Sequence, residues 1–199
     1  MMQSLEEGTI LVKTARKTIA AYLQDGKTPS RPNVPSGLLE KQGVFVTLIK
    51  KGELRGCIGQ PLPRMSLIGA LIDSAISAAT RDPRFQPLTH DELPQVEIEV
   101  SVMTKPEVLK VEHPKEYPRL IVVGRDGLIV ECGVDVGLLL PQVPVEWKWD
   151  SEDFLSHTCT KAGLSPNSWF DRKVRVSKFS AQIFGEKGPN GEVEERKLK

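Results

Sequence analysis

The segment LRGCIG, at residues 54–59, combines two glycines, a thiol and a guanidinium directly after an apolar segment. Side chains of an extended strand alternate between its two faces, so we expect Arg55 and Cys57 to share a face, roughly 7 Å apart. Gly56 lies between them and has no side chain, which allows another group to approach the backbone closely. The pattern predicts a site on the second strand of a hairpin that turns at residues 50–53.

Charge and cysteine content narrow the class of protein. The 199 residues carry 27 basic and 26 acidic side chains, a formal net charge of +1, so nucleic acid is not an expected partner. No apolar run reaches the ~18–20 residues that cross a bilayer, and the first eight residues lack the positive start of a signal peptide. The three cysteines, Cys57, Cys132 and Cys159, are far apart and odd in number, which favours reduced thiols. We therefore expect a soluble, cytoplasmic protein with no membrane partner.

Helical periodicity predicts three main helices, at residues 4–24, 66–81 and 152–163. Ser4 and Glu7 have the spacing of a capping box, and Ser151 is the expected cap of the third helix. The second helix is apolar around most of its circumference, so we expect it to be heavily buried.

Alternation and turn residues predict the strands. We expect them at residues 44–50, 54–59, 96–103, 108–111, 120–125, 127–132 and 174–184, with a turn at 125–127 and a further strand that carries Trp147 and Trp149. Long helices between hairpin-like strands predict an α+β fold with mostly antiparallel sheets. The charged, aperiodic tail at 187–199 is expected to fray.

Three interpretations of the Arg55–Cys57 pair remain open. Arg55 could favour the thiolate of Cys57 and so create a nucleophile. The pair could instead bind an anion, with the guanidinium as a fork. Finally, Cys57 could pack as a small hydrophobe while Arg55 pairs with an acid on a neighbouring strand.

Carboxylates on two predicted strands are further candidates. Glu97 and Glu99 share one face of the strand at 96–103, and Glu99 is the more central of the two. Glu131 lies on another strand, beside Cys132. Each could act as a general base, pair with Arg55, or simply be solvated, because a strand with one open face shows the same alternation.

No cofactor or metal site is predicted. Only His157 and Cys159 bring two potential metal ligands close together, and positions two apart on a helix do not share a face. No glycine-rich nucleotide-binding pattern is present. The tryptophans are too few and too scattered to indicate a base-stacking platform.

Several segments in this order resemble the AMMECR family, named for a human chromosomal region linked to Alport syndrome, midface hypoplasia and elliptocytosis. They are LRGCIG at 54–59, DPRF at 82–85, EVSV at 99–102, GRDGL at 124–128, LPQV at 140–143, CTKAGL at 159–164 and Trp169. The likeness extends over residues 5–186, so we expect one AMMECR domain there. The resemblance implies two unequal subdomains that form one unit, with a cleft between them and the hexapeptide at or near it.

The resemblance also implies partners, namely Memo-like proteins and a radical-SAM enzyme, although this chain lacks cluster-binding cysteines of its own. Two functional hypotheses follow. In the first, the protein is an enzyme or enzyme component that acts on a small molecule or a protein: Cys57 is the nucleophile or substrate anchor, Arg55 holds an anion, and Glu99 or Glu131 moves protons. In the second, it is a non-catalytic binding module that docks a protein or nucleic acid, and the hexapeptide is structural.

Overall fold

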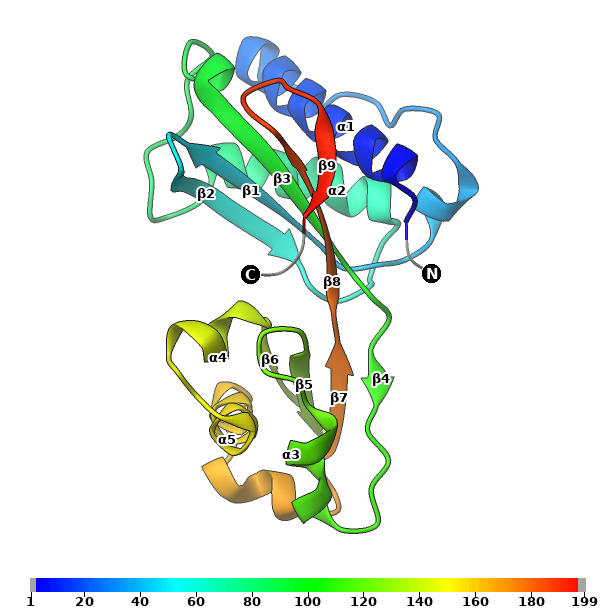
Figure 1. Cartoon of the computed structure of the whole chain (residues 1–199). Coiled ribbons are helices and arrows are strands. Elements are labelled where there is room, and N and C mark those ends of the chain that lie inside the picture. The colour runs from blue at the N-terminus through cyan, green and yellow to red at the C-terminus, as the bar shows by residue number, and fades with distance from the viewer. Residues whose placement is uncertain (1–2, 197–199) are drawn as a thin grey trace. The chain divides into compact units, whose positions relative to one another are not determined.

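The computed structural model describes residues 3–196, which form two compact units (Figure 1). Within the described residues the first unit holds 3–104 and 182–196, and the second holds 105–181. Each unit has its own sheet and its own hydrophobic core. The predicted α+β class with antiparallel sheets is confirmed.

The first unit is a five-stranded sheet in the order β2-β1-β3-β8-β9. Its strands are β1 (Val44–Lys50), β2 (Glu53–Gln60), β3 (Val96–Met103), β8 (Ala181–Glu186) and β9 (Val193–Arg196). Its helices are α1 (Leu5–Asp25), α2 (Leu67–Thr80) and the short 3-10 helices at Ser36–Leu39 and Leu93–Gln95. The turn between β1 and β2 has two residues, Lys51 and Gly52, with φ of 54° and 81°, as a tight hairpin requires.

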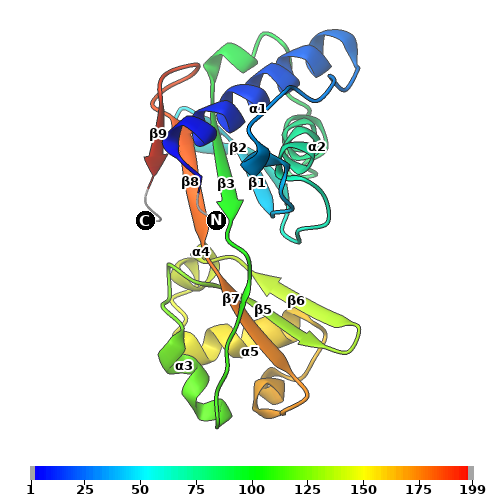
Figure 2. The ribbon, with the colours of Figure 1, turned by 90° about the vertical axis from the view of Figure 1, so that its right-hand side faces the viewer.

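Helices α1 and α2 cover one face of this sheet (Figure 2). Alternate residues of β1 and β3, such as Val46 and Val100, are fully buried on that face, whereas Thr47 and its neighbours on the other face stay half-buried. A Cβ on Gly8 of α1 would lie 2.1 Å from the Phe184 ring, so α1 packs directly on β8. The capping box that the sequence predicts at the start of α1 is present.

The second unit is a four-stranded sheet in the order β4-β7-β5-β6. Its strands are β4 (Glu107–Val108), β5 (Gly127–Cys132), β6 (Asp135–Leu139) and β7 (Arg175–Phe179). Its helices are α3 (Tyr117–Leu120), α4 (Gln142–Glu146), α5 (Ser151–Lys161) and 3-10 helices at Pro114–Glu116 and Pro166–Phe170. A Cβ on Gly137 of β6 would lie 2.4 Å from the Thr158 carbonyl oxygen, so α5 packs closely on this sheet.

The prediction of a strand at residues 120–125 is wrong. Leu120 ends α3, and the carboxylate of Asp126 closes the following loop by accepting the Val122 N–H at 2.9 Å. This bond turns the chain back on itself before β5 begins. The hairpin of this unit is formed instead by β5 and β6, which turn at Gly133 with a φ of 62°.

The segment around Trp147 and Trp149 is not a strand. Both residues follow α4, and the next helix begins one residue earlier than a Ser151 cap implies. Asp150 is the cap, because its Oδ1 accepts the N–H groups of Glu152 and Asp153, both at 2.9 Å.

The predicted strand at 174–184 is two strands, β7 and β8, which belong to different sheets. The tail is ordered further than expected, since β9 pairs with β8 at residues 193–196. Residues 197–199 of the predicted tail lie outside the described part of the chain.

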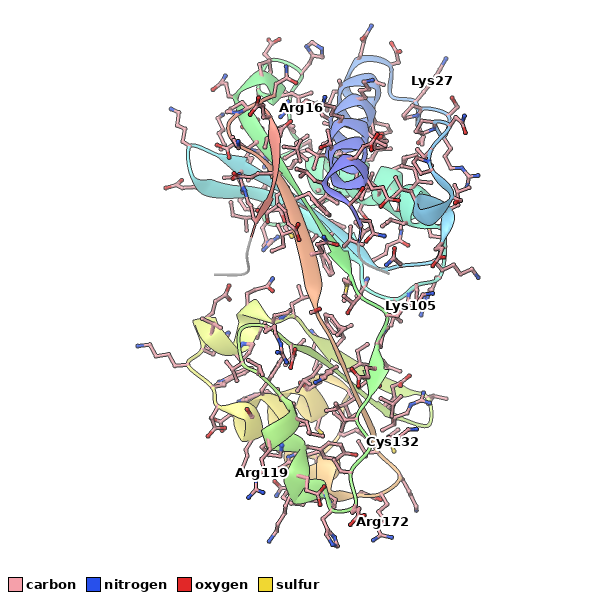
Figure 3. The ribbon with its side chains drawn as sticks, turned by 45° about the vertical axis from the view of Figure 1, so that its right-hand side comes forward. Arg16, Lys27, Lys105, Arg119, Cys132 and Arg172 are labelled. Carbon is pink, nitrogen blue, oxygen red and sulfur yellow. The ribbon has the colours of Figure 1, made fainter. Side chains whose placement is uncertain are left out.

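A buried ion pair joins α1 to the sheet of the first unit. Arg16 extends from α1, as Figure 3 shows. It pairs with Glu186 at the end of β8 with a shortest N–O distance of 2.5 Å, and the two side chains are 13% and 3% exposed. The same carboxylate accepts the Ile98 N–H of β3 at 2.9 Å. Glu186 therefore connects α1, β3 and β8 through one buried charge.

Replacing Glu186 by alanine should lower the free energy of unfolding by about 3 kcal/mol, because it leaves the largely buried Arg16 without its counter-charge. The matched control is Glu192→Ala, which removes the exposed partner of Lys187 and should change stability by less than about 0.5 kcal/mol. Urea unfolding of the two variants measures the difference. Equal losses would contradict the role assigned to Glu186.

Candidate functional site

The hexapeptide lies on β2, at the free edge of the five-stranded sheet. Cys57 lies opposite Thr47 of β1, but the register shifts between Leu48 and Ile49, which leaves Arg55 without a partner residue. Such a bulge redirects a side chain from the alternation of a regular strand. We predicted that Arg55 and Cys57 share one face of the strand, and the observed register does not support this. The two side chains have different partners.

The guanidinium of Arg55 forms a fork with Glu92, in the loop before β3. Its Nε and Nη2 lie 2.9 and 3.0 Å from the two carboxylate oxygens, and both side chains are 16% exposed. Lys50 Nζ donates to the same carboxylate at 2.8 Å. These hydrogen bonds, led by that from Arg55, lower the pKa of Glu92 to about 2 despite its partial burial. The fork that one interpretation assigned to an anion is occupied by an acid of the same unit.

The backbone of Cys57 is closed at the sheet edge by two side chains. Its N–H donates to Asp82 Oδ2 at 2.8 Å, and its carbonyl oxygen accepts from Arg84 Nη2 at 3.3 Å. Arg84 also donates to Asp82 from Nε and Nη2, at 2.9 and 2.7 Å. The pair thus takes the place that a further strand would have beside β2.

This outward N–H identifies Cys57 and Thr47 as a non-hydrogen-bonded pair, in which opposite side chains lie closer together. Thr47 Oγ1 donates to Cys57 Sγ at 3.3 Å, as that geometry allows. Hydrogen bonds from Arg84 and from the Cys57 N–H hold the pKa of Asp82 well below its usual range. Asp82 is therefore ionised whenever the protein is folded near neutral pH.

The thiol of Cys57 is not activated. Burial, the largest cause, raises its pKa, and the charges of Asp82 and Glu99 act in the same direction. The hydrogen bond from Thr47 and the charge of Arg84 act against this rise without cancelling it. A thiolate nucleophile needs the opposite balance. The cation that acts on this thiol is Arg84, not Arg55.

Both glycines of the hexapeptide are required by packing. A Cβ on Gly56 would lie 2.3 Å from the Ala78 carbonyl oxygen of α2. A Cβ on Gly59 would lie 2.4 Å from the Phe45 ring. The close approach that a glycine between Arg55 and Cys57 permits is thus used by a helix of the same unit.

Glu99 lies in the row that contains Cys57. Thr47 is opposite Cys57 on one side and opposite Glu99 of β3 on the other, so the three residues cross the sheet on the face away from the helices. Glu99 Oε2 accepts from Arg196 Nη1 of β9 at 3.0 Å. The guanidinium of Arg196 crosses over Gly185, where a Cβ would lie 2.6 Å from its Nε. Glu99 is near the thiol but is already paired.

Glu131 belongs to the second unit. It lies opposite Arg175 of β7, and Arg175 Nη2 is 2.8 Å from its Oε2. Glu131 therefore forms a cross-strand ion pair on the sheet of that unit.

The residues that hold the hexapeptide in place are Asp82, Arg84 and Glu92, none of which was predicted as part of the site. The signal in the sequence was an acid and an arginine on either side of a proline, directly after a buried helix. Their contact with Cys57 depends on how α2 returns to β2, which local patterns do not give.

Between residues 3 and 196, no group of three or more histidine, cysteine, aspartate or glutamate side chains is arranged to hold a metal ion. Over the same part of the chain, every helix is too short or too polar to cross a bilayer.

Glu92 makes the stability of the first unit depend on acidity. Its folded-state pKa is depressed from 4.5 to about 2, so its contribution is complete above pH 4.5 and is lost as the pH falls toward 2. We expect Glu92→Gln to be less stable than the parent at neutral pH, with a difference that shrinks over that interval. Asp91→Asn, which removes the neighbouring exposed acid, is the matched control. Thermal unfolding across the pH series measures the effect, and a difference that stays constant with pH would contradict it.

Comparison with known proteins agrees with the resemblance in the motifs. The family model described as AMMECR1 matches residues 12–184. Protein MJ0810 of Methanocaldococcus jannaschii is 53% identical over 98% of this chain and 98% of its own length. A protein of Methanothermobacter thermautotrophicus is 55% identical over 93% of this chain and 97% of its own. The crystal structure of uncharacterized protein PH0010 from Pyrococcus horikoshii is similar with a TM-score of 0.84 and 50% identity, covering 97% of this chain and 98% of that one. The chain belongs to the AMMECR1 family.

Proposed function

We propose that this protein is a non-catalytic binding module that docks a protein partner, and that its hexapeptide is structural. One observation carries the proposal: the polar groups of Arg55 and Cys57 are engaged within the first unit, and the thiol is held in its protonated form. An enzyme that used this pair would need a free guanidinium or an activated thiol. Neither condition is met.

The expected partner is a protein because large apolar side chains are exposed while the net charge is close to zero. A formal net charge of +1 gives nucleic acid no general attraction. Large apolar side chains are exposed at several places in each unit, and burying such side chains favours association with another protein. They include Leu54, Met65, Val134, Val136, Val145 and Trp147. Memo-like proteins and a radical-SAM enzyme, the partners that the family resemblance implies, are the first to test.

A cytoplasmic setting is part of the same proposal. Cys57, Cys132 and Cys159 are all free thiols. Unpaired cysteines of this kind are typical of reducing compartments.

The reactivity of Cys57 toward a thiol reagent tests the proposed function. Because its pKa is raised, we expect labelling in the folded protein to be at least about tenfold slower than in the unfolded chain near pH 8. The labelling rate of Cys57 should continue to rise above the pH at which the labelling rate of an ordinary thiol reaches its plateau. Mass spectrometry of the digested protein separates Cys57 from Cys132 and Cys159.

The enzyme hypothesis makes the opposite prediction for the same experiment. Rapid labelling that reaches its plateau below about pH 7 would show a stabilised thiolate and would overturn the binding-module proposal. The half-buried Cys132 serves as the internal control for reagent access.

A further inference from the structure

Three aromatic rings are stacked in the second unit. Trp149 lies on His157 with ring centroids 3.8 Å apart and planes 4° from parallel. Trp147 continues the stack, 6.1 Å from Trp149 with an interplanar angle of 20°. Trp147 is 66% exposed, so the stack ends in an indole that is open to solvent. An exposed tryptophan backed by two further rings is unusual for a residue with no binding role.

Backbone hydrogen bonds define the turn that carries both tryptophans. After α4, the N–H of Lys148 donates to the Val145 carbonyl at 3.2 Å, and the N–H of Trp149 donates to the Pro144 carbonyl at 2.8 Å. These two bonds form the Schellman motif that ends many helices. Lys148 has a φ of 56° at the position where glycine is usual. The turn between the two tryptophans is therefore defined by hydrogen bonds.

The sequence from Glu146 to Asp153, which contains both tryptophans, is strongly negative. Residues 146–153 carry four acids and one base, a net charge of −3 in a chain whose total is +1. The acids are Glu146, Asp150, Glu152 and Asp153, all of them exposed. Asp153 lies four residues before His157 on α5, so the two share a face of the helix. A negatively charged ligand would be repelled here, and a cation would be attracted.

We propose that the stack formed by Trp147, Trp149 and His157 binds a basic segment of a protein partner, with an arginine or lysine side chain lying on the Trp147 indole. Tryptophan is the best aromatic partner for such a cation, and the neighbouring carboxylates match its charge. Val145, 46% exposed at the end of α4, adds apolar surface for the rest of the segment. This proposal rests on the proposed function and names the docking site for its partner.

The test uses the full chain and an acetylated tetra-arginine amide as the probe. We expect the peptide to shift the indole N–H resonance of Trp147 in nitrogen-15 NMR spectra, with the buried Trp169 as internal reference. Binding should weaken as salt is added, because the pairing is between exposed charges. Equal or tighter binding of tetra-glutamate or of adenosine monophosphate would overturn the proposal. So would the absence of any shift at millimolar peptide.

Two variants test whether the peptide binds at Trp147. Trp147→Ala should weaken tetra-arginine binding about fivefold, the range expected when a cation–π contact is lost. Phe170→Ala, which removes another exposed aromatic side chain of the same unit, should leave it unchanged. Equal losses in both variants would contradict a site at Trp147.

Lys148→Gly distinguishes a cationic ligand from an anionic one. Glycine suits the positive φ at this position, so the turn should persist while the local net charge becomes more negative. Tetra-arginine should bind this variant at least as tightly as the parent, and a weakened binding would overturn the proposal. If these tests fail while Cys57 remains slow to label, the docking site is wrong and the binding-module function stands.

Discussion

The carboxylate of Asp82 is the contact on which the hexapeptide edge of the sheet depends. It accepts the backbone N–H of Cys57, which faces away from β1. It also binds the guanidinium of Arg84, which in turn donates to the Cys57 carbonyl oxygen. An unpaired strand edge invites pairing with another chain. Here a side-chain pair occupies the middle of that edge. LRGCIG is consequently a closed edge whose polar backbone groups at Cys57 already have partners within the same unit.

The rest of the motif follows from this closure. Gly56 lets α2 approach β2, and α2 delivers Asp82 at its end, so the glycine and the acid are parts of one arrangement. Arg55, displaced by the bulge, pairs with Glu92 in the loop that α2 leads into. Phe85 lies between these contacts, with its ring centroid 5.9 Å from the Arg55 guanidinium and 5.5 Å from that of Arg84. The motif joins an edge strand, a buried helix and the loop between them.

Local sequence patterns predicted most of the first unit. The alternation at 44–50 and 96–103 gave both strand boundaries correctly, and the Ser4–Glu7 spacing marked the start of α1. In the second unit, two predictions were wrong near Asp126 and Asp150. The side chain of Asp126 accepts a hydrogen bond that closes the loop after α3, and that of Asp150 accepts one that begins α5. Such bonds compete with strand pairing, and periodicity does not report them. The stack of Trp147, Trp149 and His157 was missed because its members come from a turn and a helix.

Within the candidate site, the sequence identified the segment but not the partners of its residues. Cys57 and Glu99 do lie in one row across the sheet, which agrees with the prediction that both segments are strands. The acids that matter to Arg55 and Cys57 are Glu92 and Asp82, which lie 37 and 25 positions away. Contacts at such separations depend on the return path of α2, so only the folded structure supplies them.

Amide hydrogen exchange at Cys57 tests most directly whether Asp82 closes the edge of β2. We expect this amide to be protected in the native protein, and we expect Asp82→Ala to speed its exchange about tenfold more than that of amides in the centre of β1. That comparison separates a local opening from a general loss of stability. A Cys57 amide that exchanges in the parent protein as fast as an unprotected strand edge would show that Asp82 does not close the edge of β2.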